Sequence, residues 1–93
     1  MKTYDDLQFK PIDWLGPNCN GIFARMFFDN GYGISVVRHE HAYCDNYTYE
    51  VAVIKGNPDK WRITYDTDIT DDVLSYQTPS DITNVMKQIQ ELK

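Results

Sequence analysis

The feature that most constrains the fold is a pair of alternating segments joined by an Asn-Gly dipeptide. Residues 21–28 (GIFARMFF) place apolar side chains at every second position, as the two-residue period of a β-strand requires. A second strand-like segment follows at residues 33–40 (GISVVRHE). The connection between them contains Asn30-Gly31, which favours a type I′ turn because such a turn needs positive φ at both central positions. The sequence therefore predicts an antiparallel hairpin.

A second hairpin is expected further along the chain. Residues 46–55 (NYTYEVAVIK) alternate most clearly and are rich in tyrosine and β-branched residues, which are enriched in strands. Residues 56–60 (GNPDK) are typical of a turn, and residues 61–67 (WRITYDT) supply another alternating segment. Residues 21–67 are thus predicted to form a four-stranded antiparallel β-meander.

The C-terminal segment, residues 78–92, has the signals of an amphipathic helix. Thr78 can cap it, Pro79 suits the first helical position, and Asp81 occupies the acidic position of a capping box. An apolar stripe at helical spacing is predicted to pack on one face of the sheet. It consists of Ile82, Val85, Met86, Ile89 and Leu92.

The remaining segments complete one small α+β domain spanning residues 1–93. Residues 1–20 are expected to form an N-terminal arm and loop, since Pro11 forces an extended backbone before it. Residues 70–76 (TDDVLSY) are predicted to form a short helical turn capped by Thr70. A chain of 93 residues supports a single modest core, and 42% hydrophobic residues are enough to fill it.

Composition narrows the classes of partner. A net charge of −5 argues against direct nucleic-acid binding and against anionic membranes, because both require basic residues to neutralise phosphate, and it suits a protein with a basic surface. The chain contains no apolar run of roughly 20 residues and no apolar signal-peptide core, so we expect a cytoplasmic protein. Cys19 and Cys44 are then expected to be reduced thiols.

His39, His41 and Cys44 form the candidate metal site. The two imidazoles share one side of a continuing strand, and a thiolate would add a third ligand of the types that zinc prefers. The sequence offers no clear fourth ligand, no C-x-x-C pair and no group that would orient a catalytic base for Cys44. We therefore favour a polar hairpin end with no metal, no cofactor and no enzymatic activity. A small metal-binding domain or metal-dependent enzyme using these three residues is the alternative.

An acidic stretch and a surplus of tyrosines indicate a binding surface. Residues 65–72 (YDTDITDD) carry four aspartates, and alternate strand positions lie roughly 7 Å apart, a spacing that resembles successive phosphates of a nucleic-acid strand. Seven tyrosines exceed what one helix can cover, so some are expected on an open sheet face, where they often anchor partners. The residues predicted to contact a partner are Asp66, Asp68, Asp71, Asp72, Tyr32, Tyr47 and Tyr49.

Three segments carry a resemblance to a known group of proteins. Residues 30–38 (NGYGISVVR), 49–56 (YEVAVIKG) and 65–90 (YDTDITDDVLSYQTPSDITNVMKQIQ) resemble short uncharacterised proteins of bacteriophage and prophage genomes, from about residue 20 onward. By analogy with other small acidic phage proteins, the resemblance implies a non-enzymatic inhibitor or modulator of a host factor, such as an anti-CRISPR-like inhibitor of a defence nuclease. The protein would then act in the host cytoplasm on a host or phage protein. A structural phage component is a further alternative, and a homodimer is compatible with either role.

Overall fold

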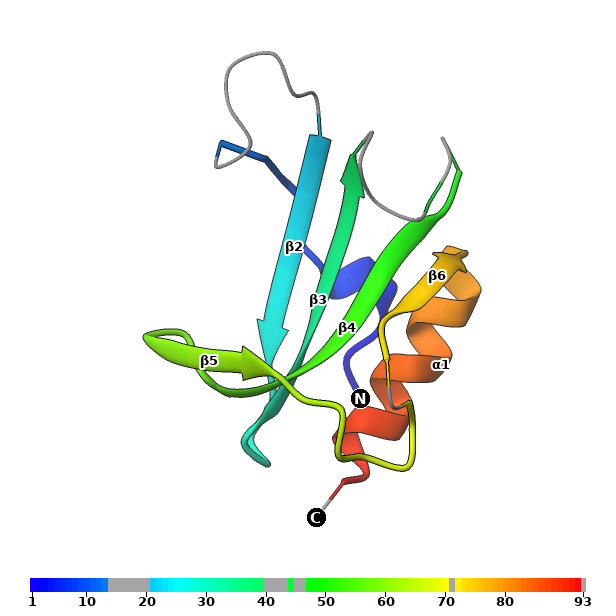
Figure 1. The fold of residues 1–93 in the computed structure, drawn as a ribbon. Helices are drawn as coiled ribbons and strands as arrows, with labels where there is room; N and C mark the ends of the chain where they lie inside the picture. The colour runs from blue at the N-terminus through cyan, green and yellow to red at the C-terminus, as the bar shows by residue number, and fades with distance from the viewer. Residues whose placement is uncertain (14–20, 40–43, 45–46, 71, 93) are drawn as a thin grey trace.

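The structure, a computed structural model, describes residues 1–13, 21–39, 44, 47–70 and 72–92. The chain forms one antiparallel sheet with a single C-terminal helix against one of its faces (Figure 1). The elements in chain order are η1 (Tyr4–Asp6), β1 (Lys10–Pro11), β2 (Gly21–Phe27), β3 (Tyr32–His39), β4 (Tyr49–Asn57), β5 (Lys60–Ile63), β6 (Leu74–Gln77) and α1 (Pro79–Gln90). The predicted α+β class with a C-terminal helix is confirmed.

The sheet has six strands among the described residues, whereas the sequence predicted four. The order is β1-β2-β3-β4-β5, and β6 also pairs with β4. β4 accommodates two neighbours on one edge because β5 pairs with its residues 54–57 and β6 with its residues 49–51. The strands missed from the sequence, β1 and β6, are two and four residues long, too short to show a reliable alternation.

Residues 70–76 do not form the predicted helical turn. Leu74–Gln77 is strand β6, and Leu74 lies against the core beside Val51 of β4. Thr70, expected to cap a helix, instead bonds to the backbone of Asp72. Pairing with the open edge of β4 therefore decides the conformation of this segment, which its local sequence left ambiguous.

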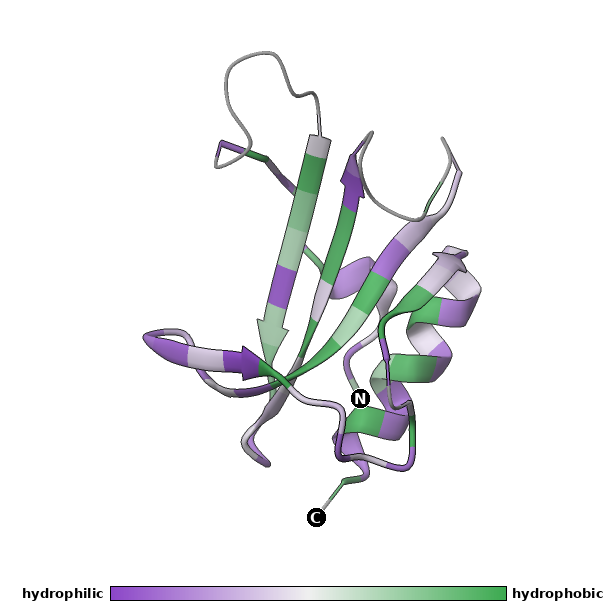
Figure 2. Ribbon diagram, viewed as in Figure 1, coloured by the Kyte–Doolittle hydropathy of each residue, from purple (hydrophilic) through white to green (hydrophobic). Residues whose placement is uncertain are grey.

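The core lies between α1 and one face of the central strands. Alternate residues of β3 and β4 meet the apolar stripe of the helix, and apolar residues recur along both elements in Figure 2. The buried cluster consists of Ile34, Val36, Tyr49, Val51, Val53, Ile82, Val85, Met86 and Ile89. Leu92, the last residue of the predicted stripe, is only partly buried, because α1 ends at Gln90.

The predicted capping box at the start of α1 is confirmed. The Asp81 amide donates to the Thr78 hydroxyl at 3.2 Å, and the Thr78 amide donates to the Asp81 carboxylate at 3.0 Å. The Thr78 hydroxyl donates to the same carboxylate. These hydrogen bonds, from the backbone first, hold the pKa of Asp81 below its ordinary value.

The turn between β2 and β3 forms at Asn30-Gly31 but is not of type I′. Only Gly31 has positive φ there, at 84°, and the Phe28 amide donates to the Tyr32 carbonyl at 2.7 Å. This is a three-residue loop closed by a left-handed glycine. The Asn30 amide group donates to the carbonyls of Ile89 and Leu92 at 2.8 and 3.0 Å, so the side chain caps the end of α1. That long-range role accompanies an ordinary backbone conformation at Asn30.

The N-terminal segment is tied to the helix instead of forming only a loose arm. The Tyr4 amide donates to the Thr83 hydroxyl at 3.1 Å. The Lys2 amide donates to the Gln90 side chain at 2.9 Å, and that side chain donates to the Lys2 carbonyl at 2.8 Å. η1 therefore lies beside α1 on the same face of the sheet.

Candidate protein-interaction surface

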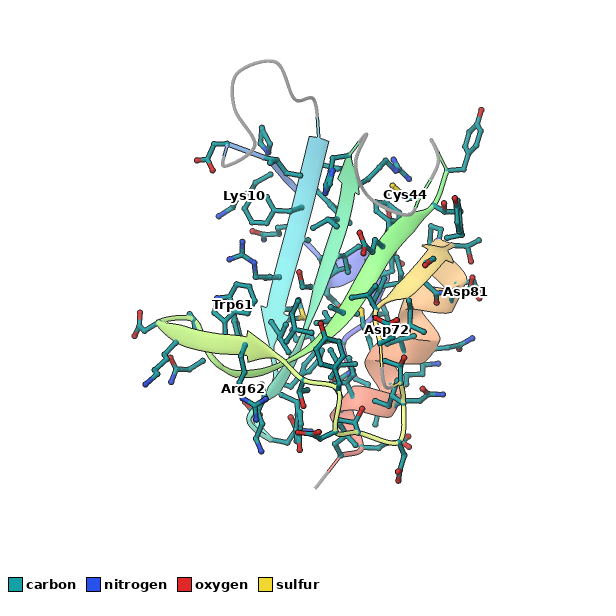
Figure 3. All side chains as sticks on the ribbon, viewed as in Figure 1. Lys10, Cys44, Trp61, Arg62, Asp72 and Asp81 are labelled. Carbon is teal, nitrogen blue, oxygen red and sulfur yellow. The ribbon has the colours of Figure 1, made fainter. Side chains whose placement is uncertain are left out.

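Negative charge is concentrated in the C-terminal third of the chain. Residues 64–93 contain six acidic and two basic residues, whereas the preceding part contains eight acidic and seven basic residues. Figure 3 shows Asp72 and Asp81 on the side of α1, with Arg62 on the opposite side of the molecule. Four of the five net negative charges thus belong to the segment that contains β6 and α1.

A series of threonine turns shapes the chain between β5 and β6. The hydroxyls of Thr64, Thr67 and Thr70 each accept a hydrogen bond from the backbone amide two residues later, at 3.4, 3.3 and 3.1 Å. Each is a side-chain-supported turn of the kind that serine and threonine favour. The three-residue spacing of these threonines is a sequence signal that could have predicted an irregular but ordered segment here.

The same segment presents its carboxylates to solvent. Thr64 is buried and donates its amide to the Val53 carbonyl at 2.9 Å, which anchors the start of the segment to the sheet. Asp66, Asp68 and Asp72 are exposed, although one Asp72 oxygen accepts a hydrogen bond from the Val73 amide at 2.7 Å. Asp71, also predicted to contact a partner, lies outside the described residues.

The tertiary structure adds a carboxylate that the sequence did not point to. Asp68 and Ile69 share a hollow of about 370 Å³ with Gln88, Glu91 and Leu92 at the end of α1. Glu91 is exposed there. The helix C-terminus carries a partial negative charge that reinforces both carboxylates. We call Asp66, Asp68, Asp72 and Glu91 the acidic surface.

The tyrosines predicted to contact a partner occupy different environments. Tyr47 is 82% exposed, and Tyr32 is partly buried with the Lys55 ammonium 5.4 Å from its ring centre. Tyr65 and Tyr76, not singled out from the sequence, are 47% and 56% exposed and border the acidic segment on either side. These two tyrosines are better placed than Tyr32 to act with the carboxylates.

Tyr49 does not belong to any exposed surface. It is only 4% exposed because it lies on the helix-facing side of β4, so its selection as a contact residue was wrong. Its hydroxyl is 2.7 Å from that of Tyr4, and the Arg38 guanidinium lies 4.0 Å from its ring centre. Burial, followed by the hydrogen bond with Tyr49, raises the pKa of Tyr4 to about 12.

The candidate metal ligands are described only in part. His39 ends β3, and the Cys44 thiol donates to the His39 backbone carbonyl at a sulfur–oxygen distance of 3.6 Å. His41 and Cys19 lie outside the described residues, whereas Cys44 is a free thiol. Among the residues that the structure does describe, no three His, Cys, Asp or Glu side chains gather as a metal site. The three-ligand hypothesis therefore stays a prediction.

Aromatic residues also mark the sheet face opposite α1, as the surplus of aromatics predicted. The Arg25 guanidinium carbon lies 4.8 Å from the ring centres of both Phe23 and Trp61. Trp61 remains 37% exposed. Trp14, which was considered as a cover for this face, lies outside the described residues. The cation therefore brings β2 and β5 together across the face that carries no helix.

Two wider observations complete the description. Within the described part of the chain, no helix has the length and apolar character needed to cross a membrane. Comparisons of the chain with family models, curated proteins and solved structures find no significant match.

Proposed function

We propose that the chain is a non-enzymatic interaction protein that binds a basic surface of a host or phage protein through its acidic surface. The observation that carries the proposal is the gathering of exposed carboxylates from two segments around the end of α1. Complementary charge speeds association and selects partners, and an acidic patch on an ordered segment suits a basic protein. The role that fits this binding is that of a phage-type inhibitor or modulator of a host factor, such as a defence nuclease.

Tyr65 and Tyr76 supply the apolar part of this interface. Both are about half exposed and flank the acidic segment, so each can bury further ring area when a partner binds. Tyrosine is enriched among the residues that dominate binding energy, because it offers a large area at low entropic cost. Carboxylates would then steer the partner, while the two rings supply most of the affinity.

Quantitative capture from bacterial host lysate tests the proposal. The test variant carries Asp66→Asn, Asp68→Asn and Glu91→Gln, which remove three charges from the acidic surface. The matched control carries Asp13→Asn, Asp29→Asn and Asp59→Asn, which remove three exposed charges elsewhere. We expect partners retained by wild type and the control to be lost from the test variant, and retention to fall as salt rises. An identical set of partners for all three proteins would contradict the proposed surface.

A further inference from the structure

A second hollow opens beside the end of α1, at the convergence of three distant parts of the chain. It has a volume of about 560 Å³ and is lined by the N-terminal segment, the β2–β3 turn and α1. The side chains that matter for its chemistry are those of Lys2, Asp6, Phe27, Phe28, Asp29 and Gln90. Its size falls within the range of about 300–1,000 Å³ typical of ligand pockets. Figure 1 shows the N-terminus, the β2–β3 turn and the end of α1 at the same end of the molecule.

Hydrogen bonds hold the walls of this hollow in place. The Gln90 side chain bonds to both the amide and the carbonyl of Lys2, and also donates to the Met86 carbonyl at 3.0 Å. Asn30 fixes the β2–β3 turn to the helix end through Ile89 and Leu92. A hollow tied together in this way needs little ordering when a ligand enters, which favours binding.

The lining selects a planar cation. Phe27 and Phe28 supply aromatic rings, while Asp6 and Asp29 supply carboxylates. One Asp6 oxygen accepts a hydrogen bond from the Thr3 amide at 2.8 Å, which orients that carboxylate. Two carboxylates against one ammonium, from Lys2, leave the lining side chains negative, and the end of α1 adds partial negative charge. An anion would meet an unfavourable potential there.

We infer that this hollow receives the guanidinium group of an arginine that a basic partner presents. Guanidinium is flat, stacks on aromatic rings and donates several hydrogen bonds in one plane, so it can use the rings and a carboxylate together. A lysine ammonium would use the charge but less of the rings. The inference rests on the proposed function, since it names the side chain by which the basic partner docks next to the acidic surface.

The test uses a defined probe, acetyl-Gly-Arg-Gly-amide, titrated into the isotope-labelled full chain. Backbone amide shifts of residues 27–31 report binding at the hollow. A matched peptide with citrulline in place of arginine keeps the shape and removes the charge. We expect saturable shifts with the arginine peptide and none with the citrulline peptide. Equal shifts with both peptides, or no shifts with either, would overturn the inference.

Two charge variants with opposite expected effects separate binding from a change in the fold. Asp29→Asn should weaken binding of the arginine peptide roughly fivefold, because a charge-assisted contact is lost. Lys2→Gln should tighten binding about twofold, because a competing cation is removed. Asp59→Asn, at the tip of the other hairpin, should leave binding unchanged. If Asp29→Asn and Asp59→Asn behave alike, the hollow is not the site.

The outcome also distinguishes this inference from the proposed function. A partner captured through the acidic surface, without any binding of the arginine peptide, would remove the arginine site and leave the interaction function intact. Binding of the arginine peptide, with the same proteins captured by wild type and by the acidic-surface variant, would refute the acidic surface and leave the hollow as a cation site.

Discussion

Tyr76 is the most strained described residue, and removing its side chain in two ways measures that strain. Its φ is 54°, the only positive φ among the described residues other than glycine. It lies where the pairing of β6 with β4 is irregular between Tyr49 and Val51, so a bulge forces this conformation. A left-handed conformation costs an L-residue roughly 1–2 kcal/mol because its Cβ approaches the following carbonyl oxygen.

The comparison is between Tyr76→Ala and Tyr76→Gly, because both variants lose the ring equally and differ only in Cβ. Going from alanine to glycine should remove about 1–2 kcal/mol of strain, while the freer unfolded chain costs about 0.4–1 kcal/mol. We therefore expect the glycine variant to be more stable than the alanine variant by about 0.5–1 kcal/mol. Tyr65, which is similarly exposed at 47% and has no positive φ, provides the control position. There glycine should be less stable than alanine by about 0.4–1 kcal/mol.

Urea unfolding followed by far-ultraviolet circular dichroism gives the free energy of unfolding of all four variants. The sign of the alanine-to-glycine change should differ between the two positions. The same sign and size at both positions would refute the strain at Tyr76. If the interface proposed above is correct, Tyr76→Gly should also lose partner affinity despite its favourable backbone, because the anchoring ring is gone.

Three further predictions concern the core, the helix start and alkaline stability. Met86→Ala should destabilise the fold by about 2–5 kcal/mol in urea unfolding, since Met86 is fully buried against the sheet, whereas an effect below about 1 kcal/mol would contradict that packing. Thr78→Ala should cost about 1 kcal/mol through loss of the helix cap, with Thr83→Ala as a contrasting variant that disturbs only the N-terminal attachment. Because the pKa of Tyr4 is raised from 10.0 to about 12, its stabilising contribution is complete below pH 10 and is lost as the pH rises toward 12. Unfolding measured across that range should show a smaller alkaline loss in Tyr4→Phe, and an unchanged loss would rule out this phenol as its source.

The local parts of the fold were predictable because their signals lie within a few residues. Strands β2, β3 and β4 follow from apolar alternation, and the start of α1 follows from Thr78 and Asp81, whose capping bonds span three residues. The exposure of Asp66 and Asp68 was likewise readable from a run of charge beside a strand end. Such features depend on backbone geometry and neighbouring side chains alone.

Tertiary packing decided the rest. Residues 70–76 carry a plausible helix cap, yet β4 has an unfilled edge that Leu74–Gln77 completes, so pairing overrides the local preference. Tyr49 alternates like its neighbours in the sequence, and only the position of α1 determines that its side of β4 is buried. Glu91 joins the acidic surface, and Asp29 meets Asp6, because the chain brings distant segments together at the end of α1. The sequence by itself determined which segments are strands and where the helix starts; which faces are covered, and which charges meet, depended on contacts between residues up to 88 positions apart.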